Sequence, residues 1–408
     1  MKQPGIKVYG YRWAVLAAFM LIIAVNQACW ITFAPITGEA ARYYGTSDLV
    51  IGLLSLVFMV LYVLTALPAA WMIDTWGFRR SVGAGALLTA VGALGRGFLS
   101  ARLELVFAAQ IAIALGQPLV LGAITKLAAR WFPPQERATA AGLGTLGIYL
   151  GILAAMLVTP TLTLHLRIGG MLRVYGFAAM AAAALFLALA RERPRTPPAA
   201  AEQDARSLVF VGLRSMLRNR DFLLLLAIFF IGLGMFNGVT TWIETIVRAR
   251  GFSSAQAGLL GGLMLAGGIL GAVAIPLISD ALRRRKPFIL MALIGLLPGL
   301  AGVTFATRPW LLLASGFLFG FFLLSAGPIG FQYGAEITLP APEGTSNSLL
   351  LVMGQVSGIL FIFGMEAFMA PSGSMTRSLI ALLLLTVVAV VLAVLLRESP
   401  IRGSTPEG

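Results

Sequence analysis

Long apolar runs recur from one end of the chain to the other. Hydrophobic residues make up 59% of the 408 residues and charged residues only 11%, whereas soluble proteins carry about 25% charge. The runs are continuous and of the length, about 20 residues, that a helix needs to cross a bilayer, which favours helices over short alternating barrel strands. We therefore expect an all-α membrane protein with twelve transmembrane helices, near residues 12–36, 49–71, 81–100, 105–129, 138–160, 171–190, 221–246, 255–279, 287–306, 310–336, 345–369 and 377–396.

The distribution of Lys and Arg predicts how these spans are oriented. If the N-terminus lies inside the cell, 20 basic residues fall in inner segments and 8 in outer segments. Basic residues accumulate in cytoplasmic loops, so we expect a multi-pass protein of the cell (plasma) membrane with both termini cytoplasmic. The same effect explains the net charge of +14 without a nucleic-acid partner.

A short polar segment, in which an acid precedes basic residues, occurs twice between apolar runs. The first copy contains Asp74, Gly77, Arg79 and Arg80, and the second, 206 residues later (280 − 74), contains Asp280, Arg283 and Arg284. Two copies of one membrane hairpin predict two pseudo-symmetric six-helix bundles. The expected divisions are an N-terminal bundle (1–190), a cytoplasmic linker (191–220), a C-terminal bundle (221–397) and a cytoplasmic tail (398–408).

Six plus six spans, a central linker and the repeated hairpin resemble the major facilitator superfamily. The segment 131–140, Trp-Phe-Pro-Pro-Gln-Glu-Arg-Ala-Thr-Ala, is also similar to the loop that this family has between spans four and five. The resemblance implies two halves that rock about a central cavity, with the hairpin as a cytoplasmic gate. Physically, an acid near an Arg of a neighbouring helix makes a charge-assisted contact that one orientation of the halves can hold. The alternative is that Arg79 and Arg80 only anchor the topology.

Three stretches are similar to one group within that family, the feline leukaemia virus subgroup C receptor-related (haem/choline) transporters. They are residues 11–36, residues 116–122 and residues 343–361. In that group the matching Asn, Trp and two Gln line a central site for choline-like quaternary ammonium compounds. The resemblance carries this role to Asn26, Trp30, Gln117 and Gln355.

The residues themselves support a binding site at mid-depth. Asn26 and Trp30 are four apart and share one helix face, while Gln117 and Gln355 each lie mid-way along a span. Polar groups at that depth are costly unless they face protein or water, and a Trp ring attracts a cation. The seventh span adds Phe236, Asn237 and Thr241. The alternative for the two Gln is hydrogen bonding across helices, which only joins the helices.

Charged residues within the spans bear on coupling and on the sign of the substrate. Glu244 and Glu366 lie near outer span ends, as vestibule or coupling acids, and neither is at the depth of a buried proton carrier. Facilitated diffusion is therefore favoured over proton coupling. Arg96 in the third span supports an organic-anion carrier instead, unless it packs between helices and extends its charge outward.

Together these features predict a monomeric secondary transporter that moves a small organic cation of the choline or ethanolamine type by alternating access, as a uniporter. The alternatives are a proton-coupled monocarboxylate or other organic-anion carrier, and a membrane receptor or scaffold that transports nothing. The chain has no zinc, nucleotide or nucleophile motif. We therefore expect neither an enzyme nor a bound metal or cofactor.

Overall fold

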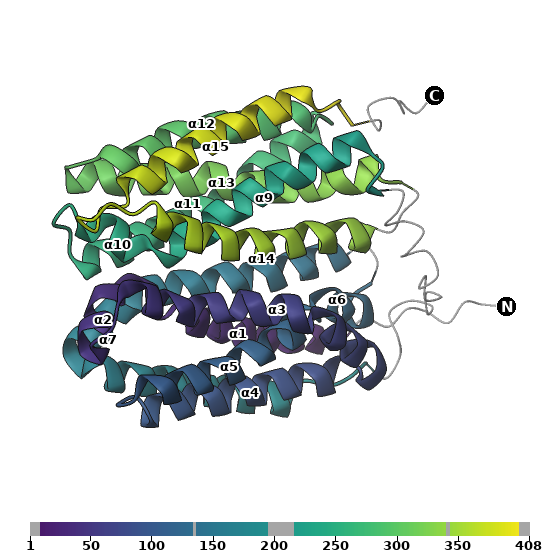
Figure 1. Ribbon diagram of the computed structural model, residues 1–408. Coiled ribbons are helices and arrows are strands. Elements are labelled where there is room, and N and C mark those ends of the chain that lie inside the picture. The colour runs from purple at the N-terminus through teal and green to yellow at the C-terminus, as the bar shows by residue number, and fades with distance from the viewer. Residues whose placement is uncertain (1–8, 134–135, 195–215, 340–342, 400–408) are drawn as a thin grey trace, which may run out of the picture. The chain divides into compact units, whose positions relative to one another are not determined.

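The computed structural model describes residues 9–133, 136–194, 216–339 and 343–399, and all regular structure in these ranges is helical. The chain divides into two compact units, residues 1–202 (unit 1) and 203–408 (unit 2). Eleven helices in the described ranges are long and apolar enough to cross a membrane. One of them, α7 (Arg137–Leu189), contains a non-helical residue, Arg167 (φ 58°, ψ 175°), and is two helices joined at a kink. The predicted all-α membrane fold is confirmed (Figure 1).

Each unit is built from helices that run alongside one another. Unit 1 consists of α1 (Tyr11–Ile31), the short 3₁₀ helix η1 (Ala34–Ile36), α2 (Thr37–Tyr44), α3 (Asp48–Trp76), α4 (Phe78–Phe98), α5 (Leu103–Leu121), α6 (Ile124–Trp131) and α7. Unit 2 consists of α9 (Arg220–Thr241), α10 (Ile243–Arg248), α11 (Ser254–Ala281), α12 (Lys286–Phe305), α13 (Pro309–Ile337), α14 (Glu343–Ala367) and α15 (Thr376–Leu395). Most of the predicted linker and tail, residues 195–215 and 400–408, lies outside the described residues.

The two units follow one backbone plan with a constant offset of 206 residues. Serine caps show it first: Ser47 precedes α3 and Ser253 precedes α11, and each hydroxyl accepts a backbone N–H of the first turn. Left-handed turns show it throughout. Six described residues have positive φ, and they form three pairs at this offset: Gly45 with Gly251, Gly77 with Arg283, and Arg167 with Gly373. The repeat that the two hairpins predict therefore extends over the whole length of each unit.

A contact between matched turns follows the same offset. In unit 1 the Tyr44 hydroxyl donates to the backbone oxygen of Ser100 (2.9 Å), just beyond the end of α4. In unit 2 the Arg250 guanidinium donates to the backbone oxygen of Ala306 (3.0 Å), just beyond the end of α12. The free carbonyl groups at a helix end need donors, and each unit supplies one from the matched position with a different side chain.

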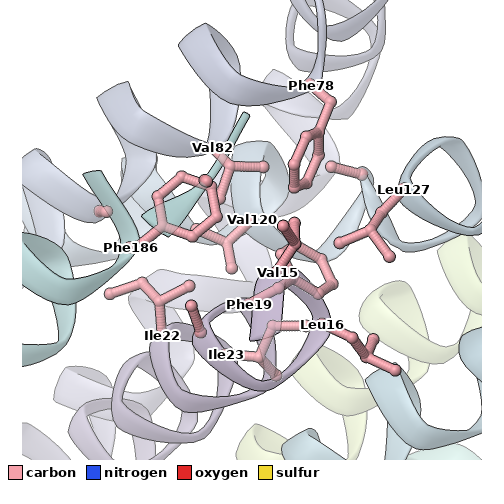
Figure 2. Close-up of a cluster of buried hydrophobic side chains, with 14 of the residues drawn as sticks. Val15, Leu16, Phe19, Ile22, Ile23, Phe78, Val82, Val120, Leu127 and Phe186 are labelled. Atoms are coloured by element: carbon pink, nitrogen blue, oxygen red, sulfur yellow. The ribbon is translucent and has the colours of Figure 1, made fainter. Parts of the chain in front are cut away.

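Apolar side chains from six helices, α1, α3, α4, α5, α6 and α7, form a buried cluster in unit 1, part of which Figure 2 shows. The ring of Phe78 on α4 lies between two others, 5.7 Å from the ring of Phe19 on α1 and 5.8 Å from that of Phe186 on α7. Val120 of α5 and Leu127 of α6 complete the cluster. Because lipid is as apolar as these side chains, close packing rather than removal from water stabilises the arrangement.

Candidate functional site

A carboxylate beyond the end of α7 closes the first polar hairpin. Glu192 accepts the backbone N–H of Phe78 (3.0 Å) and of Arg79 (2.7 Å), and it forms an ion pair with Arg130 of α6. A helix N-terminus favours a negative charge, so Glu192 caps α4. Gly77 makes the cap possible, because a Cβ atom at this position (φ 88°) would collide with the Glu192 carboxylate.

Asp74, the predicted gating acid, has its cation partner on a different helix from the hairpin arginines. The Lys126 ammonium of α6 donates to Asp74 Oδ1 (3.0 Å) and to the backbone oxygen of Ile73 (2.6 Å). Arg79 donates to the backbone oxygen of Leu187 (3.3 Å), and the Arg80 side chain is exposed. The contact at this end of unit 1 therefore joins α3 to α6, and α4 to the end of α7.

The second hairpin has the same cap and a denser set of charges. Glu398 accepts the backbone N–H of Arg285 (2.8 Å) and of Lys286 (3.2 Å). The Arg285 side chain forms ion pairs with Asp280 and with Glu336 of α13 (3.0 Å). Partial burial by itself would lower the pKa of Arg285, but the hydrogen bonds and charges of Glu336 and Asp280 outweigh it and raise that pKa. The guanidinium therefore stays charged.

Arg283 and Arg284 form the turn of this hairpin, and both side chains are exposed. The Arg283 N–H donates to the backbone oxygen of Asp280 (3.1 Å), and the Ser279 hydroxyl donates to that of Arg284 (2.6 Å). Their gating role stays a prediction, as do those of Asp74, Gly77, Arg79, Arg80 and Asp280.

Asn26 and Trp30 lie on α1, and both side chains are buried and hydrogen-bonded within unit 1. The Asn26 amide donates to Thr89 Oγ1 (3.0 Å) on α4 and accepts a hydrogen bond from Gln27 (3.3 Å). The Trp30 indole donates to the backbone oxygen of Ser55 (3.1 Å) on α3. The ring of Trp30 is thus held in one orientation, whereas the amide of Asn26 is used to join α1 to α4.

Gln117 of α5 differs from Asn26 because its carbonyl group is unused. The side chain is 5% exposed, and its Oε1 atom has no hydrogen-bond partner in the structure. A buried acceptor without a donor costs about 1–3 kcal/mol. No hydrogen bond in the described part of the chain joins Gln117 to Asn26 or Trp30, so Gln117 remains free to accept one from another molecule.

The end of α9 carries the corresponding set in unit 2. Asn237 donates to the backbone oxygen of Gly354 on α14 (3.2 Å). Gly354 directly precedes Gln355 in the chain. The hydroxyls of Thr240 and Thr241 are buried and without partners, although a helical threonine can donate to the carbonyl four residues earlier. Phe236 is buried just before them, so apolar and unsatisfied polar atoms occur together over less than two turns.

The two candidate acids and Gln355 lie in distinct surroundings. Glu244, in α10, is buried and forms an ion pair with Arg248 (3.1 Å). Glu366 is partly exposed near the end of α14, and Gln355 is partly exposed midway along the same helix. Arg248 therefore compensates the charge of Glu244 in this structure, and the roles of Glu244 and Glu366 as vestibule or coupling acids stay predictions.

Arg96 of α4 is fully buried, and neighbouring helices occupy its terminal nitrogen atoms. Nη1 donates to the backbone oxygen of Cys29 (3.0 Å) and to Gln110 Oε1 (2.9 Å), and Nη2 donates to Thr32 Oγ1 (3.1 Å). Among the described residues no Asp or Glu forms an ion pair with it. Arg96 thus packs between helices, as one alternative expected, but its charge is bonded inside unit 1 and does not extend outward.

Comparison with known proteins decides the family. The profile of the Major Facilitator Superfamily matches residues 19–362. The chain belongs to the major facilitator superfamily. It is 31% identical over 383 residues to solute carrier family 49 member A3 of Xenopus tropicalis, covering 90% of this chain and 79% of that protein. It is 29% identical over 377 residues to the human choline/ethanolamine transporter FLVCR2, covering 87% and 72%.

A solved structure of this superfamily has the same fold. A bacterial homologue of the human lysosomal transporter Spinster superposes with a TM-score of 0.75 at 16% identity, over 95% of this chain and 97% of that one. Together with the family match, this establishes a membrane transporter of the major facilitator superfamily. The predicted likeness to the feline leukaemia virus subgroup C receptor-related group is confirmed by the human relative.

The sequence pattern did not identify four charged residues that form ion pairs or helix caps at the two hairpins. They are Lys126, Glu192, Glu336 and Glu398. A signal was present for two of them, because Glu398 follows Glu192 by the 206 residues (398 − 192) that separate the hairpins. Lys126 and Glu336 gave no such signal, since each lies within an apolar run.

Proposed function

We propose that this transporter moves a small organic cation of the choline or ethanolamine class down its gradient. The observation that carries the proposal is Gln117, whose buried side-chain oxygen has no partner. Such an oxygen accepts a hydrogen bond from a hydroxyl or primary ammonium group and repels an anion. The unpartnered hydroxyls of Thr240 and Thr241 in unit 2 can each accept or donate a hydrogen bond, so they suit a neutral hydroxyl group of the substrate.

The Trp30 ring supports the same substrate class. Its indole N–H donates to the backbone oxygen of Ser55, which fixes the orientation of the ring. A substrate can then interact with the face of the ring but not with its N–H group. A cation over a desolvated Trp face gains about 2 kcal/mol. We propose that Trp30 and Gln117 of unit 1, and Phe236, Asn237, Thr241 and Gln355 of unit 2, contact the substrate during the transport cycle. Asn26 joins α1 to α4 through its hydrogen bond to Thr89.

The charges inside the spans count against the organic-anion alternative and against proton coupling. Arg96 donates through its two terminal nitrogen atoms to Cys29, Gln110 and Thr32, while its buried Nε atom has no partner. A carboxylate substrate would have to displace these contacts to form a two-bond pair with the guanidinium. Glu244 is paired with Arg248. A proton-coupled carrier needs a carboxylate that titrates in the transport path, and Glu366 at the end of α14 is partly exposed. Uniport follows as the simplest coupling.

Ligand-dependent thermal stability of the purified protein tests the substrate class. Ligand at about 100 times Kd stabilises the folded state by about 2.7 kcal/mol, so choline should raise the unfolding midpoint by several degrees. Gln117→Ala or Gln355→Ala should abolish the shift. Gln332→Ala is the matched control, because Gln332 bonds to Glu336 (3.0 Å) near the second hairpin, and it should keep the shift.

Two outcomes would contradict the proposal. If carboxylates raise the midpoint and choline and ethanolamine do not, the substrate is an anion. If uptake of radiolabelled choline into proteoliposomes requires an imposed proton gradient, the transporter is coupled and one of the acids carries the proton. Uptake that follows the choline gradient alone supports uniport.

A further inference from the structure

The first transmembrane segment is broken where it carries Trp30. Helix α1 ends at Ile31, and after two turn residues the chain continues as η1 from Ala34. Pro35 has no N–H and cannot donate to the carbonyl of Ile31, four residues earlier. The last carbonyls of α1 therefore need donors from elsewhere, because an unsatisfied carbonyl inside a membrane is costly.

Two side chains from other helices supply those donors at one carbonyl. The backbone oxygen of Cys29 accepts from Arg96 Nη1 (3.0 Å) and from Gln110 Nε2 (3.3 Å). Arg96 Nη2 also holds the hydroxyl of Thr32 (3.1 Å), the first residue beyond the helix. Arg96 comes from α4 and Gln110 from α5, and both are fully buried.

The end of α1 also explains how Arg96 can be charged without a carboxylate. A helix C-terminus carries a partial negative charge of about half an elementary charge, which stabilises a nearby cation. Within the described residues Arg96 has no acidic partner, and its guanidinium lies against that terminus, with the Tyr175 ring 5.9 Å away. The positive charge of Arg96 and the partial negative charge at the broken end of α1 thus stabilise each other.

The same contacts extend to the carbonyls that orient Trp30. Gln110 Nε2 donates to the backbone oxygen of Leu54 on α3 (3.1 Å). The next residue, Ser55, accepts the Trp30 indole N–H (3.1 Å) through its backbone oxygen and directs its hydroxyl to the Trp30 carbonyl (3.4 Å). Adjacent carbonyls of α3 therefore hold Gln110 and Trp30 side by side.

We infer that Arg96 and Gln110 are positioning residues that hold the broken end of α1 and thereby fix the Trp30 ring for a cationic substrate. The inference rests on the proposed function for its effect on transport, but the clamp itself is a property of unit 1. Unit 2 has glycine at the matched positions, Gly302 and Gly316, so this clamp belongs to unit 1.

The single cysteine of the chain reports on the clamp independently of transport. Cys29 is fully buried, and its own carbonyl is the one that Arg96 and Gln110 hold. Loss of charge-assisted hydrogen bonds should make local opening easier, so Arg96→Leu should react with N-ethylmaleimide about tenfold faster or more. Gln110→Leu should act in the same direction, and it serves if Arg96→Leu does not fold. Arg96→Lys keeps the charge at the helix end and should restore slow labelling.

Arg250→Leu is the matched control, since Arg250 also donates to carbonyls at a helix end, those of Thr304 and Ala306 in unit 2. It should leave labelling of Cys29 unchanged. In choline uptake, Arg96→Leu and Gln110→Leu should raise the half-saturation concentration severalfold more than they lower the maximal rate, and Arg96→Lys should recover most of it.

The outcomes separate the two proposals. Slow labelling of Cys29 in both Arg96→Leu and Gln110→Leu overturns the clamp, even if choline is transported. Fast labelling in both, with slow labelling in Arg96→Lys, supports it, even if the unmodified protein does not move choline and the proposed function fails. A fall in maximal rate alone, with half-saturation unchanged, overturns the positioning of Trp30.

Discussion

The crossing of α1 with α7 in unit 1 and that of α9 with α14 in unit 2 occupy matched positions, yet glycine serves a different purpose in each. In unit 1 the glycines lie on α7 and face backbone: a Cβ atom at Gly147 or Gly151 would meet the carbonyl oxygen of Met20 or Ala24 on α1. Small residues allow such close contact between membrane helices. Such a collision can be relieved only if one of the two helices moves as a whole, because backbone atoms cannot rotate away as side chains do.

In unit 2 the glycines of the matched crossing face side chains. A Cβ atom at Gly234 or Gly238 of α9 would meet Phe361 or Met365 of α14. An aromatic ring or a thioether can rotate away from a new contact, and Met adapts to irregular space particularly well. The positions that match Gly147 and Gly151 are Met353 and Ser357, which already carry side chains.

The duplicated backbone plan therefore does not determine which pairs of helices are in direct backbone contact. In unit 1, α1 is held to α7 by backbone contact and clamped at its C-terminal end by Arg96. In unit 2, α9 packs on α14 through side chains that can shift. We therefore expect α9 and α14 to adjust more readily than α1 and α7.

The largest effect should come from filling the backbone contact. Gly151→Ala should destabilise the protein by about 3 kcal/mol, because overpacking against backbone is only relieved by moving α1. Gly238→Ala meets the sulfur atom of Met365 and should cost less than about 1 kcal/mol, because Met adapts. The measurement is the thermal midpoint of the detergent-solubilised protein. Equal losses in the two variants would mean that both crossings are equally rigid.

Much of the fold was predictable because the bilayer leaves few choices. A spanning segment must satisfy its own backbone groups, so continuous apolar runs become helices, and the two hairpins at Asp74 and Asp280 revealed the duplication. The break in α1 was not predicted, because the apolar run 12–36 continues through Pro35 as one span. The kink at Arg167 lies between the predicted spans 138–160 and 171–190, so the division of α7 into two helices was predictable. The positive φ of Arg167 was not, since the residue itself has no preference for it.

The site was less predictable because its contacts join residues far apart in the chain. Sequence spacing placed Asn26 and Trp30 on one face of α1, but the partner of Asn26 is Thr89, 63 residues away. Likewise the partner of Arg96 was invisible, because a helix end carries partial charge without any charged residue. Local pattern gives the direction of a side chain and leaves its distant partner unspecified.

The first hairpin turn should show the next largest effect. Gly77 has φ 88° and ψ 170°, a conformation that costs other residues about 1–3 kcal/mol, and a Cβ atom there displaces the Glu192 cap. Gly77→Ala should therefore lower stability by about 2 kcal/mol. At the matched position, Arg283→Gly should be nearly neutral, because relief of strain at φ 50° offsets the greater freedom of glycine in the unfolded chain. A marked loss in Arg283→Gly would show that the turns are held differently.

The smallest effect separates the two caps. Glu192 accepts backbone N–H groups of α4 and also forms an ion pair with Arg130. Glu398 accepts the corresponding backbone N–H groups of α12. In that hairpin the ion pairs of Arg285 are with Asp280 and Glu336. Glu192→Gln should cost about 1 kcal/mol, since partial exposure screens the pair. Glu398→Gln should cost about half as much, at the lower end of the range for loss of a helix cap, because glutamine keeps one acceptor oxygen.

Salt distinguishes the ion pair from the cap. Screening weakens exposed charge pairs, so the difference in thermal midpoint between Glu192→Gln and the unmodified protein should shrink as sodium chloride is raised. The difference for Glu398→Gln should change less, because its contacts are to backbone N–H groups. If the two variants lose equal stability and respond alike to salt, the ion pair with Arg130 adds nothing to the cap, and the two hairpins are energetically equivalent despite their different charges.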